Sequence, residues 1–165
     1  MNAPLQLRDT EGLDDALKGS YGWWFRGVTD AFAFLEGEHG YVLTQVQRHF
    51  RGPWVRYAGR RYLIMVSFEP EPRVVEGDIW VAEDLSPFVS PFAYPRVIEI
   101  PDLLMRREPR TDWSGRARAG RLSNGEAVGV AELWAGGIRA HAKDLLAGRP
   151  LRGIRWPPRE GPATM

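Results

Sequence analysis

Apolar residues recur at helical spacing directly after the polar start of the chain. Between residues 23 and 38 they stand three or four positions apart, as on one face of a helix. Gly40 follows this pattern, and glycine commonly ends a helix. The sequence therefore predicts a helix over about residues 23–38. Its apolar face consists of Trp24, Val28, Ala31, Phe32 and Leu35.

Alternating apolar and polar residues follow this helix and predict a series of strands. Only short turns separate them, which favours an antiparallel meander. The third run is apolar on both faces, so we expect a central strand covered on both sides. Gly77, inside the fourth run, predicts a β-bulge. The runs are residues 41–50, 54–58, 61–69 and 74–84, with a short fifth at 96–100.

The last strongly periodic segment predicts a long helix that starts after Ser123. Ser123 and Glu126 have the spacing of a capping box, and Gly148 with Pro150 gives a stop. Gly136 and Gly137 interrupt the pattern, so either the helix breaks there or another part of the chain packs close. The expected buried stripe is Trp134, Ile138, His141 or Ala142, and Leu145.

These patterns together predict an α+β fold. It has an N-terminal helix, a four- to five-stranded antiparallel meander sheet and a C-terminal helix packed on the sheet. The 165 residues fit a single domain. We expect a polar N-terminal segment over residues 1–22, one α+β domain over 23–149 and a loosely ordered tail over 150–165.

Composition narrows the function classes. The net charge of +1, from 22 basic and 21 acidic residues, argues against a dedicated nucleic-acid-binding protein. The absence of cysteine excludes disulfides, cysteine metal sites and a cysteine nucleophile. The chain starts without the basic region and apolar run of a signal peptide, and no apolar stretch fits a transmembrane helix. We therefore expect a cytoplasmic protein without membrane contact.

Motifs that carry catalytic chemistry are missing from the sequence. No phosphate-binding loop, dinucleotide fingerprint or nucleophile elbow is present. His39, His49 and His141 stand apart from one another and from any carboxylate at ligand spacing. Glu76 and Asp78 would share a strand face and could hold a divalent cation, but a solvated edge-strand face is the favoured explanation. We expect no cofactor, no metal site and no catalytic residue.

Charge is distributed unevenly along the expected sheet. Residues 41–62 contain five arginines and no acidic residue, whereas residues 69–84 contain six acidic residues and one arginine. These segments would be neighbours in a meander. Cross-strand ion pairs would explain the pattern, and so would a bipolar surface that orients a partner protein.

Two segments supply candidate partner-binding residues. The expected hairpin "VRYAGRRYLIMVSFEP" brings arginines to its tip, and the proline-punctuated loop "SPFVSPFAYP" carries aromatic rings. Within this loop we expect Phe92 to pack on the core and Phe88 to be exposed. The arginines of the hairpin, together with Trp54, Tyr57 and Tyr62, could instead stack on nucleic-acid bases. The candidate partner-binding residues are Arg56, Arg60, Arg61, Phe88, Phe92 and Tyr94.

The order of segments resembles that of small bacterial immunity-type α+β proteins and their uncharacterised relatives. The resemblance rests on "AFAFLEGEHGYVLT", "VRYAGRRYLIMVSFEP", "VVEGDIWVAED" and "LWAGGIRAHAKDLLAGRP", and spans roughly residues 24–149. The resemblance consists of matching apolar positions and includes no shared catalytic motif. No functional residue is therefore carried over from the family. The resemblance implies a non-enzymatic protein that binds another protein, with a toxin as one class of partner.

Three functional hypotheses follow. The first is a non-enzymatic, cytoplasmic protein-binding protein of immunity type. The second is a small-ligand-binding or enzymatic domain with a pocket between sheet and helix. The third is nucleic-acid binding through the arginines and aromatic residues of the hairpin, which the near-neutral net charge of +1 disfavours.

Overall fold

A computed structural model describes residues 11–49, 52–85 and 96–156 of the chain. Its centre is one antiparallel sheet in which each strand pairs with its neighbour in sequence, in the order β1-β2-β3-β4-β5. The α+β fold with an antiparallel meander is therefore confirmed. The strands are β1 (Val42–His49), β2 (Gly52–Ala58), β3 (Tyr62–Glu69), β4 (Val74–Val81) and β5 (Val97–Glu99).

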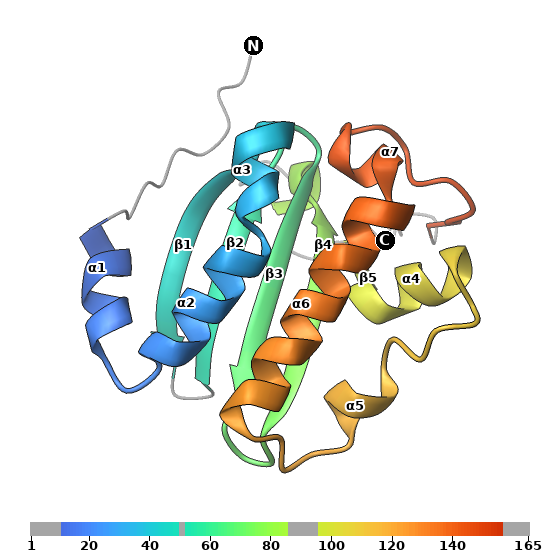
Figure 1. Cartoon of the computed structure of the whole chain (residues 1–165). Helices are drawn as coiled ribbons and strands as arrows, with labels where there is room; N and C mark the ends of the chain where they lie inside the picture. Colours follow the sequence, from blue (N-terminus) through green and yellow to red (C-terminus); the bar gives the residue numbers. More distant parts are fainter. Residues whose placement is uncertain (1–10, 50–51, 86–95, 157–165) are drawn as a thin grey trace, which may run out of the picture.

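Helices cover one face of this sheet (Figure 1). The two central helices of this layer, α2 and α6, pack against each other across the front of the strands. α1 lies beside the edge strand β1, and α4 and α5 lie beside the opposite edge. The helical segments are α1 (Glu11–Lys18), α2 (Gly22–Ala31), α3 (Ala33–His39), η1 (Ala82–Leu85), α4 (Ile100–Arg107), α5 (Gly115–Arg118), α6 (Asn124–His141) and α7 (Lys143–Leu146).

The first predicted helix is two helices in the structure. The chain turns at Phe32, whose φ of −98° and ψ of 9° lie outside the α-helical region, and α3 starts at the next residue. Phe32 is fully buried, so its side chain keeps its place in the predicted apolar face. Gly40 ends α3 in the left-handed conformation, as the sequence predicts.

The C-terminal helix begins where the capping box predicts. The Ser123 hydroxyl accepts a hydrogen bond from the Glu126 N–H at 3.1 Å. The helix continues through Gly136 and Gly137 and breaks at Ala142, where φ is −124°. A Cβ added to Gly137 would come within 2.6 Å of the Trp113 ring, which is too close for an ordinary contact. Of the two explanations for the glycine pair, close packing is the one that holds for Gly137.

Gly77 is not at a bulge. The pairing of β3 with β4 runs without a shift past Gly77, and the irregularity in the sheet lies in β1 between Leu43 and Gln45. A Cβ on Gly77 would come within 2.7 Å of the Trp134 ring of α6. Glycine is therefore required at this position by the approach of helix α6 to the sheet, not by the strand geometry.

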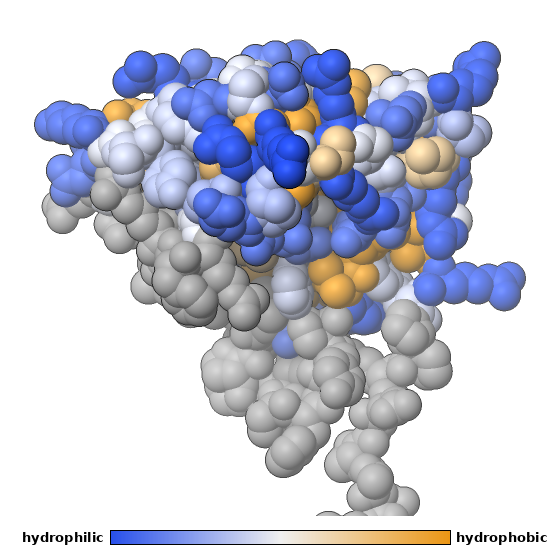
Figure 2. Space-filling view, turned by 90° about the horizontal axis from the view of Figure 1, so that it is seen from below, coloured by the Kyte–Doolittle hydropathy of each residue, from blue (hydrophilic) through white to orange (hydrophobic). Residues whose placement is uncertain are grey.

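The core lies between the inner face of the sheet and the helix layer. Buried residues alternate along β2, β3 and β4 and meet the apolar faces of α2 and α6. Viewed from the end at which α6 begins, the described surface is mostly hydrophilic, with hydrophobic residues in small areas between (Figure 2). Among the described helices, none combines the length and apolar character needed to cross a membrane.

Candidate functional site

The face of the sheet that points away from the helix layer, here called the outer face, carries the side chains that alternate with the core residues. Strand register places these side chains in rows across the sheet. One row is apolar and crosses all five strands. This apolar row is Val42, Ala58, Leu63, Trp80 and Val97.

The apolar row has exposed ends and a half-buried centre. No helix of residues 11–49, 52–85 and 96–156 packs over its centre; the labelled helices lie in front of the sheet or beside its edges (Figure 1). Leu63 and Trp80 are half-buried, whereas Val42 and Val97 at the two ends are 40% and 43% exposed. Described helices cover the inner face of the central strand, and its outer-face residues Leu63, Met65 and Ser67 are only partly exposed.

A second row, here called the charged row, runs beside the apolar row. It places Arg56 on β2, Met65 on β3, Asp78 on β4 and Glu99 on β5. The cross-strand neighbours of Arg56 are Gln45 and Met65, so Arg56 does not form the cross-strand ion pair considered from the sequence.

Arg56 is held in place by its neighbours on the sheet. Its Nε donates a hydrogen bond to the Thr44 hydroxyl at 3.2 Å, and its guanidinium lies 6.0 Å from the centre of the Trp54 ring. Burial lowers the pKa of Arg56 from its ordinary value. A guanidinium nevertheless stays protonated in proteins, so the outer face carries a fixed positive charge.

Asp78 places a carboxylate near the other side of the same face. Burial, followed by the charges of Glu99 and Glu76, raises the pKa of Asp78 to about 6. Glu99 forms an ion pair with Arg118 of α5, whereas the Asp78 carboxylate accepts no hydrogen bond from any residue that the structure describes. Groups of three or more potential metal ligands are absent from the described ranges.

Arg60 and Arg61 belong to a different surface from Arg56. Both are exposed in the turn between β2 and β3, which packs beside Gly148: a Cβ on that glycine would lie 3.4 Å from the Cβ of Arg60. The Tyr62 hydroxyl fixes this contact by donating to the Arg149 carbonyl at 2.8 Å. The structure therefore divides the three arginines predicted as one site between two surfaces. Phe88, Phe92 and Tyr94 lie outside the described residues.

The aromatic residues proposed to stack on bases are not grouped on one surface. Tyr57 and Tyr62 are 2% and 1% exposed and belong to the core, while Trp54 lies on the outer face. A base needs an accessible aromatic ring on which to stack. The hairpin therefore lacks the aromatic platform that this hypothesis requires.

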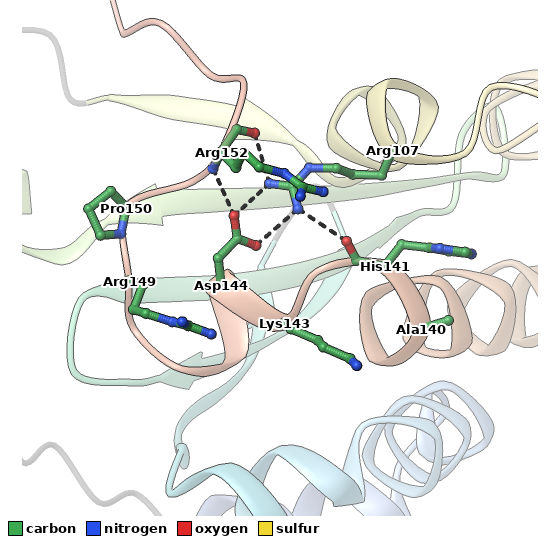
Figure 3. Close-up of a pocket in the computed structure, with 8 residues that line it drawn as sticks. All are labelled: Arg107, Ala140, His141, Lys143, Asp144, Arg149, Pro150 and Arg152. Atoms are coloured by element: carbon green, nitrogen blue, oxygen red, sulfur yellow. Dashed lines mark hydrogen bonds and ion pairs between the residues drawn. The ribbon is translucent and has the colours of Figure 1, made fainter.

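A basic cavity of about 570 Å³ lies where α4 and α6 end (Figure 3). Sequence patterns did not predict this cavity, because its residues come from three separate segments. The available signal was a concentration of arginine and lysine near the C-terminal end of the domain, which continues into the predicted tail over residues 150–165. The lining consists of Arg107, Ala140, His141, Lys143, Asp144, Arg149, Pro150 and Arg152.

A buried ion pair supports the floor of this cavity. The Arg107 guanidinium donates to both carboxylate oxygens of Asp144, at 3.0 and 2.7 Å, and to the carbonyls of His141 and Arg152. The Arg107 side chain is only 8% exposed. Burial alone would raise the pKa of Asp144, but hydrogen bonds from Arg107 and from the Arg152 N–H outweigh it and lower that pKa. The pair thus joins α4, α6, α7 and the C-terminal segment.

Comparisons of the chain with protein-family models, curated proteins and solved structures find no match.

Proposed function

We propose that this protein is a non-enzymatic binding protein that docks another protein on the outer face of its sheet. The observation that carries the proposal is the apolar row that crosses all five strands and ends in the exposed side chains of Val42 and Val97. Apolar side chains aligned across a sheet face that no described helix covers favour association with another surface.

The residue types beside this row support the same function. Tryptophan, arginine and methionine are enriched at the centres of protein interfaces, and the outer face combines Trp54, Arg56, Met65 and Trp80. Because Arg56 is already held by Thr44 and Trp54, it would lose little side-chain entropy on binding.

The charged row indicates the chemistry of the partner. An acidic group opposite Arg56 and a basic group opposite Asp78 would complement the two charges while apolar side chains cover the neighbouring row. The basic group would also relieve the cost of holding the Asp78 carboxylate, which has no hydrogen-bond donor among the described residues. The resemblance to immunity-type proteins makes a bacterial toxin the first class of partner to test.

The test is a binding measurement on candidate partners encoded next to this protein's gene. Co-expression and isothermal titration with the purified partner should give a saturable complex. Val42→Arg and Val97→Arg should each weaken it about tenfold or more, because each buries an unpaired charge in the interface. Both residues are exposed in the free protein, so the variants should fold normally.

The matched control is Leu133→Arg on α6, another large apolar residue that is 38% exposed but lies in the helix layer. This variant introduces the same charge and should leave binding unchanged. If all three substitutions left the binding affinity unchanged, the interface would lie elsewhere on the protein. Catalytic turnover without any stable complex would contradict the binding function itself.

A further inference from the structure

The basic cavity is independent of the outer face. It is bounded by the last residue of α4, the end of α6, the short helix α7 and the loop after it, as Figure 3 shows around Asp144. The cavity volume of about 570 Å³ lies in the range of small-molecule sites. The cavity is therefore large enough for a ligand and not only for solvent.

The charge of the cavity is unbalanced. Asp144 is its one acidic lining residue, and both carboxylate oxygens already accept hydrogen bonds from Arg107. The same carboxylate also accepts the Arg152 N–H at 2.7 Å and the Leu145 N–H at 3.0 Å. Asp144 thus has its acceptors occupied and offers little to further cations.

Three cationic side chains of the lining have no acidic partner among the described residues. Lys143, Arg149 and Arg152 are exposed, and none forms an ion pair with any residue in the described parts of the chain. The fold holds them around one cavity although like charges repel. An anion bound between them would remove that repulsion.

The turn between β2 and β3 extends the same positive surface. Arg60 and Arg61 are exposed beside Gly148, and the Tyr62 hydroxyl ties this turn to Arg149. Arginine and lysine around an open cavity raise the local concentration of anions. Arginine also offers paired N–H donors that fit the oxygens of a phosphate group.

We propose that this cavity binds a small molecule that carries one or two phosphate groups. Lys143, Arg149 and Arg152 would hold the phosphate oxygens, and Arg107 with Asp144 would keep the cavity floor rigid. Ala140 and Pro150 form an apolar part of the wall for the remainder of the ligand. Binding here does not depend on the docking function proposed for the outer face.

Inorganic pyrophosphate and inorganic phosphate are suitable probes, followed by ¹H–¹⁵N NMR and calorimetry on the full chain. Pyrophosphate should saturate one site and shift the backbone amide signals of residues 143–149, 151 and 152. Sulfate at equal ionic strength should bind more weakly than pyrophosphate, which carries more charge. Affinity should fall as sodium chloride is raised, since exposed charges are screened.

Lys143→Gln, Arg149→Ser and Arg152→Ser should each lower pyrophosphate affinity about tenfold. All three side chains are exposed, so these variants leave the Arg107–Asp144 pair intact. Arg116→Ser is the matched control: it removes an equally exposed arginine from α5, and affinity should not change.

The outcomes separate a small phosphorylated ligand from other anions. Saturable binding that the three cavity variants weaken supports the proposal. Equal weakening by Arg116→Ser would show only a response to net charge and would overturn it. Binding of a single-stranded oligonucleotide through the same residues, without measurable binding of pyrophosphate or phosphate, would also overturn it in favour of a macromolecular polyanion.

Discussion

At the scale of single residues, the raised pKa of Asp78 links the stability of the protein to pH. The pKa of about 6 results first from burial and then from the like charges of Glu99 and Glu76. A raised pKa in the folded state means that the folded protein binds a proton more readily than the unfolded chain does. The contribution of Asp78 to the free energy of unfolding therefore falls as pH rises from about 4 to about 6. Above that range the ionised carboxylate destabilises the folded protein by its full amount.

Replacing Asp78 with asparagine should remove this cost. We expect Asp78→Asn to be about 1 kcal/mol more stable than the wild type at pH 7.5, after allowance for solvent screening, and the difference should shrink at pH 4.5. Urea unfolding at the two pH values measures it. Glu132→Gln, at an exposed position of α6, is the control and should change little at either pH. A lower stability of Asp78→Asn at pH 7.5 would show that the carboxylate has a partner.

The positions of the charged residues could be predicted from the sequence only in part. Arg56 alternates with Val55 and Tyr57 along a predicted strand, so its position on the face opposite the core follows from the period of two. Arg60 and Arg61 were correctly expected beside a hairpin turn. That this turn packs beside Gly148, 87 residues after Arg61, depends on tertiary contacts and has no local signal.

At the scale of elements, Gly136 and Gly137 of α6 allow the effect of helix propensity on stability to be distinguished from the effect of packing. Nothing lies within 4 Å of a Cβ placed on Gly136, whereas a Cβ on Gly137 would meet Trp113 at 2.6 Å and Leu104 at 2.8 Å. Two adjacent glycines in the same helix thus have opposite surroundings.

The two alanine substitutions should therefore differ in sign. Gly136→Ala should stabilise the protein by up to about 1 kcal/mol, because alanine lowers the entropy lost on helix formation. Gly137→Ala should destabilise it by about 1–3 kcal/mol through overpacking. Thermal unfolding of both variants compares them directly. Similar stability changes in the two would mean that Trp113 and Leu104 move aside freely.

The elements themselves were predicted well because their signals are local. Each strand between residues 42 and 81 has its own alternation, and the start of α6 has its own cap at Ser123. The breaks at Phe32 and Ala142 were missed because neither residue is a glycine or proline. Both side chains are fully buried, so packing against the rest of the fold places these breaks.

At the scale of the whole molecule, the Arg107–Asp144 pair connects segments that are distant in sequence. Arg107 ends α4, Asp144 lies in α7, and the backbone of Arg152 bonds to both side chains. The sequence could not predict this arrangement, nor the cavity above it, because its parts are 37 and 8 residues apart along the chain and follow no common period.

Removing one charge of this buried pair should destabilise the protein. Asp144→Asn should cost about 3 kcal/mol, because it leaves the 8%-exposed Arg107 guanidinium without a counter-charge. Amide hydrogen exchange at Arg152 should accelerate at the same time, since its N–H bonds to Asp144. Glu38→Gln breaks the exposed pair with Arg139 and should cost about 0.5 kcal/mol or less. If Asp144→Asn also cost only about 0.5 kcal/mol of stability, the Arg107–Asp144 pair would not be what holds the C-terminal segment.

The packing of α2 against α6 has a consequence for the order in which the protein forms during synthesis. The four long strands are complete by residue 81, and their pairings connect only neighbours in the sequence, which favours early formation. The second half of the helix layer is synthesised last. Until residues 124–141 have left the ribosome, the inner face of the sheet lacks α6. The Tyr41 and Tyr62 hydroxyls lack their carbonyl acceptors until residues 145 and 149 follow. A nascent chain that stops before α6 leaves the inner face of the sheet partly uncovered, so the segment from residue 124 onward protects the preceding strands from aggregation.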